Sequence, residues 1–398
     1  MLKRIILWLG LLFYYIKGLP DFITWCFGGL IKRKLNSNNQ SLDICFVTYN
    51  ARIRETKLAY AAKLCGHRVT LITHKISLIN NIEDYFDEIY FATNPWKCLK
   101  LIQFIKPDVV HLFVNYTNAR MLPILWFSPA PIVYDPYDCM KGMMKPEQKL
   151  PWFEEYTEKL WFKKADHLCS RSLEPMYIKK TYNYAMPPST FFPDYCWKKP
   201  QFKIRQEDKR DDIRIFYSGG VVEETESSCF IDLGRSLMKQ QIHLHIYPST
   251  NIVNKINRQY IFDEAKKNPY FHIHNQVPYS ILMEEALKYD AAIVFLLNSE
   301  SKELYVTREK FKYATSNKLF DYIESGLPVI YFEKSHMKSL TEHYGTAIMS
   351  KSYSDIRKAI ISDKKKQYIN NSNTSTLAFH SQRLHTMYSS VLKYANEC

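Results

Sequence analysis

The sequence lacks the motifs by which most nucleic-acid-binding and zinc-binding proteins are recognised. It contains no RNA-recognition motif, no zinc-finger spacing and no continuous basic helix, so a nucleic-acid partner is not expected. Its nine cysteines are scattered and never form a Cys-x-x-Cys pair, which indicates neither a disulfide framework nor a structural zinc site. The pairs His243-x-His245 and His272-x-His274 are interpreted as packed or solvated strand residues. We therefore expect no metal cofactor, and a reducing compartment fits the cysteines best.

The sequence also lacks an apolar run long enough to cross a membrane. Within residues 1–34, the short apolar runs 5–16 and 22–31 are separated by Lys17-Gly18-Leu19-Pro20-Asp21 and flanked by basic residues. A span across about 30 Å of hydrocarbon needs about 20 apolar residues. A cleaved signal peptide would need an Ala-x-Ala-like site, and none follows. A spanning helix would carry charges near its middle, at about 2.5 kcal/mol or more each.

Two interpretations of residues 1–34 therefore remain besides a signal peptide or a spanning helix. The segment is either an ordinary buried N-terminal helix or a broken pair of short helices lying in the membrane interface. We favour the second, in which basic flanks contact anionic lipid and the aromatic side chains lie at headgroup depth. Those aromatic residues are Trp8, Tyr14, Tyr15 and Trp25. This interpretation predicts a peripheral or monotopic protein on the cytoplasmic face of a membrane.

Composition indicates a globular chain with a basic surface. The 398 residues suit two domains, and 46% hydrophobic with 24% charged residues excludes a disordered chain. Lysine and arginine outnumber the acidic residues 54 to 40, which gives a net charge of +14. An anionic partner is therefore expected, either nucleic acid, anionic lipid or a phosphorylated substrate, and the missing motifs disfavour the first.

Apolar strands alternate with helical segments twice along the chain, as in doubly wound parallel sheets. The first series begins at 42–48 and the second at 213–218, with a proline-containing segment and the charge run 205–212 between them. No Gly-x-Gly-x-x-Gly follows the first strand, so a dinucleotide site is not indicated there. We predict two Rossmann-like domains, a solvated linker, and a last helix that either packs on the first domain or lies on the surface. The expected bounds are 1–34 for the membrane segment, 42–190, 191–212, 213–375 and 376–398.

The stretch from Thr315 to Ile330 carries the clearest chemical signal. Its apolar residues recur at helical spacing behind a Thr-Ser-Asn start that ends at Asn317, Gly326 is placed to end the helix at a positive φ, and an apolar strand follows. Lys318 lies in the first turn, where free backbone N–H groups favour an anion, and Asp321 lies on roughly the same face. The stretch is either an ordinary helix and strand or a phosphate-binding unit.

This stretch resembles the donor-site signature of GT-B-type glycosyltransferases of the group 1, family 4-like kind. The matching positions are Lys318, Leu319, Asp321, Tyr322, Gly326, Pro328, Val329 and Ile330. The resemblance implies that Lys318 contacts the diphosphate of a nucleotide-sugar and Asp321 its ribose. It also makes Gly219 and Gly220 the first loop of the donor domain, where they are otherwise a plain tight turn. Gly66-His67-Arg68-Val69-Thr70 and the loop 49–55 resemble the acceptor side of the same enzymes.

Two features near the expected site leave alternatives open. Asp135 and Asp138 follow a predicted strand and form either an Asx-type turn without chemistry or, by the resemblance, an acceptor-side pair. One of them would act as general base if the reaction inverts. The donor loop carries acidic residues where the family often has basic ones. Arg308 is either a replacement for that missing charge or a solvated surface residue.

The resemblance and the order of elements together predict two Rossmann-like α/β domains facing a cleft, the GT-B arrangement. The predicted function is transfer of a sugar from a nucleotide diphosphate-sugar to a lipid-linked or glycan acceptor at an anionic membrane surface. No metal and no cofactor besides the donor substrate are expected. A nucleotide-sugar epimerase and a non-catalytic binding subunit of the same fold are the alternatives.

Overall fold

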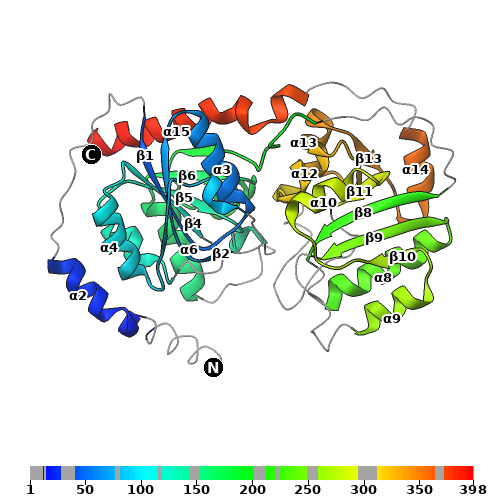
Figure 1. The fold of residues 1–398 in the computed structure, drawn as a ribbon, viewed down its shortest axis with the longest axis horizontal. Helices are drawn as coiled ribbons and strands as arrows, with labels where there is room; N and C mark the ends of the chain where they lie inside the picture. Colours follow the sequence, from blue (N-terminus) through cyan, green and yellow to red (C-terminus); the bar gives the residue numbers. More distant parts are fainter. Residues whose placement is uncertain are drawn as a thin grey trace. The chain divides into compact units, whose positions relative to one another are not determined.

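The computed structural model describes most of the chain, and its contacts divide that chain into two units. The described residues are 12, 15–27, 41–76, 81–114, 119–143, 152–200, 212–220, 224–248, 259–294, 312–363 and 372–397. The first unit comprises Met1–Asp194 with His380–Cys398, and the second comprises Tyr195–Phe379. Each unit has a parallel sheet with helices packed against it, and the two are described separately here (Figure 1).

The first unit is built on a sheet of seven parallel strands in the order β3-β2-β1-β4-β5-β6-β7. The strands are β1 (Asp43–Ala51), β2 (Arg68–Ile76), β3 (Glu88–Phe91), β4 (Val109–Val114), β5 (Ile132–Pro136), β6 (His167–Ser170) and β7 (Ser189–Phe191). Every residue of β4 and β5 is buried, because helices cover both faces of the sheet. This explains why these strands are mainly apolar, with His111 and Asp135 as buried polar residues, and it confirms the predicted doubly wound sheet.

The helices of the first unit begin and end at residues that suit their positions. They are α2 (Leu19–Phe27), α3 (Ile53–Leu64), α4 (Pro95–Ile105), α5 (Leu122–Phe127), α6 (Trp152–Lys164) and α7 (Glu174–Tyr182). The side chain of Asn94 accepts the backbone N–H of Lys97 at 2.9 Å and so caps α4, whose first residue is a proline. Gly66, just after α3, has φ of 78°, which a residue without a Cβ adopts at little cost.

The second unit is built on six parallel strands in the order β10-β9-β8-β11-β12-β13. The strands are β8 (Ile213–Gly219), β9 (Ile242–Pro248), β10 (Phe271–Ile273), β11 (Ala291–Ile293), β12 (Val329–Tyr331) and β13 (Ala347–Met349). The helices are α8 (Glu224–Met238), α9 (Gln259–Lys267), α10 (Tyr279–Ala286), α12 (Lys318–Glu324), α13 (His336–Tyr344) and α14 (Ile356–Asp363). This second parallel sheet also confirms the prediction.

Helix α12 and strand β12 form the helix–glycine–strand unit that the sequence predicts. Leu319, Phe320, Tyr322 and Ile323 are all buried, which explains their helical spacing. Gly326 has φ of 66°, and the backbone N–H of Leu327 bonds the carbonyl of Tyr322 at 2.9 Å to close the end of the helix. The structure therefore confirms Gly326 as the end of the helix.

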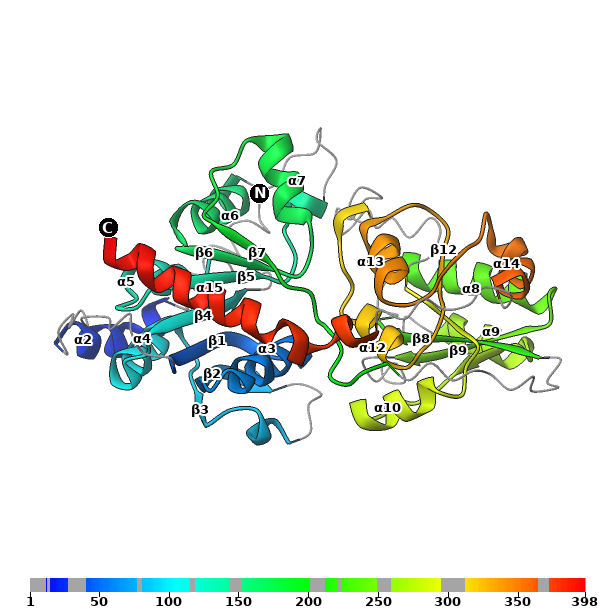
Figure 2. The same ribbon diagram turned by 90° about the horizontal axis from the view of Figure 1, so that it is seen from above.

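The last helix, α15 (Leu377–Glu397), begins at the end of the second unit, and from His380 onward it belongs to the first. Figure 2 shows this helix lying along the first sheet. Its apolar stripe is buried, and the hydroxyl of Tyr388 lies 2.7 Å from Nδ1 of His111 on β4. The stripe seen in the sequence is therefore a packing surface.

The residues after β7 differ from the solvated linker that the sequence predicts for 191–212. Phe192, Tyr195 and Cys196 are fully or almost fully buried, and the backbone N–H of Phe192 bonds the carbonyl of Ser170 at 2.7 Å. Prolines and polar neighbours suggested a connector, but these three apolar side chains fill core positions. The charge run 205–211 lies outside the described residues.

Within the described residues, no helix has the length and apolar character that a membrane crossing requires. The described part of the N-terminal segment instead packs on α4. Phe22 contacts the ring of Trp96 with a centroid distance of 4.5 Å, and a Cβ on Gly18 would lie 2.6 Å from that indole. The hydroxyl of Tyr15 donates to the carbonyl of Ala119, so this residue is also tied to the first unit.

Candidate functional site

Gly219 and Lys318 meet at the carboxyl end of β8, although they come from opposite ends of the second unit's sequence. Gly219 has φ of +143°, a backbone conformation that a residue with a Cβ rarely adopts. A Cβ at this position would lie 2.3 Å from Nζ of Lys318. Because the strands are parallel, the start of α12 and the end of β8 lie at the same edge of the sheet. The fold thus brings together two of the residues that the sequence assigns to a phosphate site.

Aromatic residues hold the Lys318 ammonium in place. Its Nζ lies 4.0 Å from the ring centroid of Tyr217, within cation–π range. The hydroxyl of Tyr217 donates to the carbonyl of Gly220 at 2.9 Å, and the hydroxyl of Tyr322 accepts the backbone N–H of Ser218 at 3.0 Å. Tyr322 therefore ties α12 to β8, and Tyr217 orders the Gly219-Gly220 turn.

Asp321 lies one turn beyond Lys318 and is half-buried. The hydroxyl of Tyr279 donates to its Oδ1 at 2.7 Å. Burial raises the pKa of Tyr279 well above its ordinary value, so the phenol keeps the proton that it donates. Asn317 precedes α12 in helical conformation and its side chain does not cap the helix. Arg308 and Glu223 lie outside the described residues.

Asp135, at the end of β5 in the first unit, is wholly buried and its carboxylate is engaged by two partners. Nε and Nη2 of Arg54 donate to Oδ1 and Oδ2 at 2.9 and 2.7 Å, and Nε2 of His111 lies 3.2 Å from Oδ2. Burial by itself would raise the pKa of Asp135, but the charge of Arg54 holds it below its ordinary value. The carboxylate is thus a buried counter-ion and is not accessible to a substrate.

Arg54 is itself an inward-facing residue of the first turn of α3, which begins shortly after β1. It is fully buried and forms a second ion pair with Asp194, and its Nη1 donates to the carbonyl of Phe192 at 3.1 Å. The sequence gives no sign of this, because an arginine is rarely fully buried. The guanidinium joins β5 to the segment after β7, and it therefore fixes the carboxyl edge of the first sheet.

Asp138 is the other predicted carboxylate, and it is only partly buried. Nη2 of Arg171 lies 3.5 Å from its Oδ1, with the Asp138 side chain 19% exposed. Two buried carboxylates hold the loop that carries Asp138. Glu158 accepts the backbone N–H of Lys141 at 3.0 Å, and Glu174 accepts the backbone N–H of Cys139 at 3.5 Å. The carboxylate of Asp138 thus lies on a fixed loop and is partly exposed.

Glu55 is a buried carboxylate beside this loop that the sequence analysis did not assign to the site. It accepts the hydroxyl of Thr48 at 3.0 Å, the backbone N–H of Arg52 at 3.0 Å and the hydroxyl of Tyr137. Burial raises its pKa to about 7, although each of these bonds opposes the rise. The guanidinium carbons (Cζ) of Arg52 and Arg171 lie 5.5 and 5.2 Å from the ring centroid of Tyr137.

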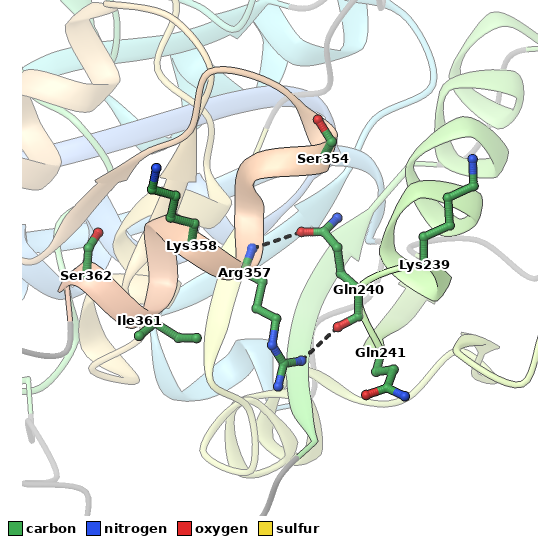
Figure 3. A pocket seen from close by; sticks show the side chains of 8 residues that line it. All are labelled: Lys239, Gln240, Gln241, Ser354, Arg357, Lys358, Ile361 and Ser362. Carbon is green, nitrogen blue, oxygen red and sulfur yellow. Dashed lines mark hydrogen bonds between the residues drawn. The ribbon is translucent and has the colours of Figure 1, made fainter.

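An open hollow of about 830 Å³ lies elsewhere in the second unit. Figure 3 shows the side chains that line it, including Gln240 and Arg357, which are joined by two hydrogen bonds of 3.0 and 2.7 Å. It adjoins the first residue of β9, whereas Gly219 pairs with the last residue of β9. The two positions are separated by the strand's length, about 20 Å at about 3.3 Å per residue. The hollow is therefore separate from the Lys318 site.

No protein-family model matches the chain, and no curated protein matches it either. Solved structures do match over nearly the whole chain. Anabaena HepE in complex with UDP-glucose is similar with a TM-score of 0.56 and 11% identity, covering 90% of this chain and 100% of that one. Sucrose-phosphate synthase from Thermosynechococcus elongatus has a TM-score of 0.53 and 11% identity, covering 89% and 97%.

A third match belongs to a different enzyme class with the same architecture. It is a putative UDP-N-acetylglucosamine 2-epimerase from Listeria monocytogenes, with a TM-score of 0.53 and 11% identity, covering 86% of this chain and 94% of that one. The chain therefore has the two-domain Rossmann-like fold called GT-B. At such low identity the likeness establishes the fold, and the reaction has to be argued from the site.

Proposed function

We propose that the protein transfers a sugar from a nucleotide diphosphate-sugar to a lipid-linked or glycan acceptor at the cytoplasmic face of a membrane. The observation that carries the proposal is the contact between Lys318 and Gly219. An ammonium group stands against this turn, in the space that a Cβ on residue 219 would occupy. Such a group suits a diphosphate, whose developing charge it would stabilise as the sugar leaves.

The neighbouring residues supply the remaining donor contacts in this proposal. Asp321, oriented by Tyr279, would accept hydrogen bonds from the ribose hydroxyls. Gly219 and Gly220 would let the backbone approach the phosphates. The reaction needs no metal in this proposal, because Lys318 provides the positive charge. HepE and sucrose-phosphate synthase support the proposal as neighbours of the same fold, and HepE was solved with UDP-glucose.

On the acceptor side, Asp138 is the carboxylate that we assign as general base for an inverting transfer. Its partly exposed carboxylate stands on a fixed loop next to Arg171, and removal of a proton from the acceptor hydroxyl requires such an accessible group. Asp135 cannot share this role, because Arg54 and His111 surround it inside the protein.

The membrane part of the proposal is supported by the exposed side chains of the N-terminal segment. Ile16, Leu19 and Ile23 are 56%, 49% and 47% exposed, and with Leu12 they recur at intervals of three or four residues, as on one helical face. A bilayer interface is a suitable partner for such a stripe with basic flanks. The double variant Ile16→Ser/Ile23→Ser should lose sedimentation with anionic vesicles, whereas Phe379→Ser, equally exposed elsewhere, should retain it. Equal sedimentation of both variants would remove the membrane role.

The donor site is tested with nucleotide-sugars on the purified full chain. Lys318→Ala and Asp321→Ala should abolish the thermal stabilisation that the cognate donor gives the parent protein. Lys334→Ala is the matched control, because Lys334 is an exposed lysine of the same unit. If no nucleotide-sugar stabilises the parent protein, the assignment of donor binding is wrong. If the donor stabilises both variants as much as the parent protein, the donor binds at another site.

The epimerase remains a second candidate because a putative member of that class shares the fold. The two reactions differ in their need for an acceptor. An epimerase converts the sugar of the donor without any acceptor, whereas a transferase releases nucleoside diphosphate when acceptor is added. A non-catalytic subunit would bind donor and do neither. NMR of the donor with and without a lipid-linked acceptor separates all three outcomes.

A further inference from the structure

Four histidines gather on one face of the sheet edge in the second unit. His243 and His245 alternate along β9 with Ile242, Leu244 and Ile246, which are buried in the core on the other face. His272 on β10 pairs in register with His245, and His274 follows β10. Two neighbouring parallel strands thus present imidazoles in adjacent positions, and all four side chains are partly exposed.

The ring nitrogens of this cluster approach one another closely. Nδ1 of His243 lies 2.8 Å from Nε2 of His272, and Nδ1 of His245 lies 2.9 Å from Nε2 of His274. One nitrogen from each of His243, His245 and His272 lies within 4.8 Å of the other two. Ligand nitrogens about 2.0–2.1 Å from a tetrahedral ion stand about 3.3 Å apart, so small ring rotations bring these three into a shared coordination shell.

We propose that His243, His245 and His272 form a binding site for a divalent transition metal of the zinc type. Imidazole is the ligand that such ions share, and three histidines with a water molecule complete a tetrahedral shell. Without a metal, the hydrogen bond between Nδ1 of His243 and Nε2 of His272 is made by a proton on one of these two nitrogens. On metal binding, that proton moves to the other nitrogen of the same ring, so both rings stay neutral and bind through lone pairs.

The surroundings favour neutral rings, and the nearby cation is balanced. Burial lowers the pKa of His245 to about 3 and the pKa values of His243 and His272 below their ordinary value, so protons do not compete with a metal at neutral pH. Arg214 pairs with His243 in register and opposes a metal ion. Its charge is offset by Asp212, whose Oδ2 lies 3.0 Å from Nη2 of Arg214.

A metal at this site would fasten the edge of the sheet. β10 is only three residues long and has β9 as its sole strand neighbour in the described sheet. A short edge strand with one partner is among the parts of a sheet that open most readily. An ion held by His243 and His245 of β9 and by His272 of β10 would crosslink the two strands, independently of donor binding at Lys318.

The test uses the full chain after treatment with a chelator. Titration with Co²⁺ should give the visible absorption of tetrahedral coordination, saturating at one equivalent and displaced by Zn²⁺. Zn²⁺ should also slow hydrogen exchange at the amides of residues 271–274. Loss of even a supporting group at a metal site costs about tenfold to a hundredfold in affinity, so His243→Gln and His272→Gln should each weaken binding at least that much.

The control is His343→Gln, which replaces an exposed histidine on α13 of the same unit. It should leave the Co²⁺ spectrum and affinity unchanged. Thermal melting without metal shows whether the cluster variants remain folded, and His245→Gln provides an independent substitution if one of them does not. Absence of saturable Co²⁺ binding, or unchanged binding in the His243→Gln/His272→Gln double variant, would overturn the proposal. Neither result depends on the donor reaction.

Discussion

Nζ of Lys318 occupies the space in which a Cβ on residue 219 would stand, at a distance of 2.3 Å. A glycine at position 219 is therefore needed for two reasons. It adopts the φ of +143°, and it leaves room for the ammonium group. The relationship adds to the bond between Tyr322 and Ser218 in linking the donor loop to helix α12. It makes the glycine, and not only the lysine, a residue on which the proposed donor site depends.

Gly219→Ala should weaken donor binding about tenfold or more. The new methyl group displaces Lys318 Nζ, and a charge-assisted hydrogen bond of the kind lost is worth about 1.5–3 kcal/mol. Gly66→Ala is the matched control, because Gly66 also has a positive φ but nothing lies within 4 Å of its absent Cβ. Both variants should lose some stability to backbone strain. Isothermal titration with donor would contradict the prediction if both bound it equally well.

Tyr279→Phe should raise the KM for the donor with a smaller effect on kcat. The change removes the hydroxyl that donates to Oδ1 of Asp321 at 2.7 Å, so the carboxylate loses one of the bonds that orient it. A hydrogen bond contributes about 1 kcal/mol net, which corresponds to about a fivefold change. Tyr156→Phe, at a tyrosine that is 53% exposed, should leave both constants unchanged. An unaltered KM in Tyr279→Phe would mean that Asp321 needs no such orientation.

Glu55→Gln should change how stability depends on pH. The folded-state pKa of Glu55 is about 7, above the ordinary value of 4.5, because the group is buried. Between these two pH values the folded protein holds a proton that the unfolded chain has released, so stability falls as pH rises through this window. The full effect is on the order of 3 kcal/mol at about 1.4 kcal/mol per pH unit.

Urea unfolding at pH 5 and pH 7 measures this contribution. Between pH 5 and pH 7 the parent protein should lose more unfolding free energy than Glu55→Gln does, because the amide does not titrate. Glu158, whose pKa burial likewise raises to about 7, is present in both proteins and cancels in the comparison. Glu342→Gln, at an exposed carboxylate, should keep the parental difference. Identical differences in all three proteins would show that Glu55 does not titrate in this range.

The sequence contained enough to predict the two sheets and the α12–β12 unit. Their central strands, such as β4 and β5, are buried on both faces and so appear as mainly apolar runs whatever lies next to them. Gly326 marks the helix end by a purely local requirement. The contact between Gly219 and Lys318 is different. The sequence singled out Lys318 by its place at a helix start and the two glycines by their place after a strand, but only the family resemblance put them in one site. No local pattern reveals which strand end a distant helix will reach.

The buried charges of the first unit could not be predicted from local pattern. Arg54 belongs to the polar segment 49–55, which the sequence assigns to a loop, yet it lies in the first turn of α3 and pairs with Asp135 and Asp194 in the interior. Those partners come from segments far along the chain, and only the completed sheet places them together. For the same reason the sequence offered Asp135 and Asp138 as equivalent carboxylates, whereas their surroundings separate a buried counter-ion from an accessible group.

Asp135→Asn should therefore lower mainly the stability of the protein, whereas Asp138→Asn should lower mainly its activity. Asp135→Asn leaves Arg54 with Asp194 as its remaining carboxylate partner in the interior, and breaking a buried pair costs about 3–5 kcal/mol of unfolding free energy. Because the pKa of Asp135 is lowered in the folded protein, this stabilisation is present above the unfolded-state value of about 3.9 and is lost as pH falls below it. Asp138→Asn removes only a partly exposed pair, worth about 1 kcal/mol or less.

Activity should show the reverse order for the two variants. A general base contributes about a hundredfold to ten-thousandfold to the rate, so Asp138→Asn should lower kcat by that range while the protein stays folded. Asp135→Asn should retain kcat per folded molecule at temperatures well below its lowered midpoint. Circular dichroism and a transfer assay at the same temperature provide the comparison. If Asp138→Asn keeps the parental kcat, the proton leaves the acceptor by another route, as in a retaining reaction, and the base assignment is wrong.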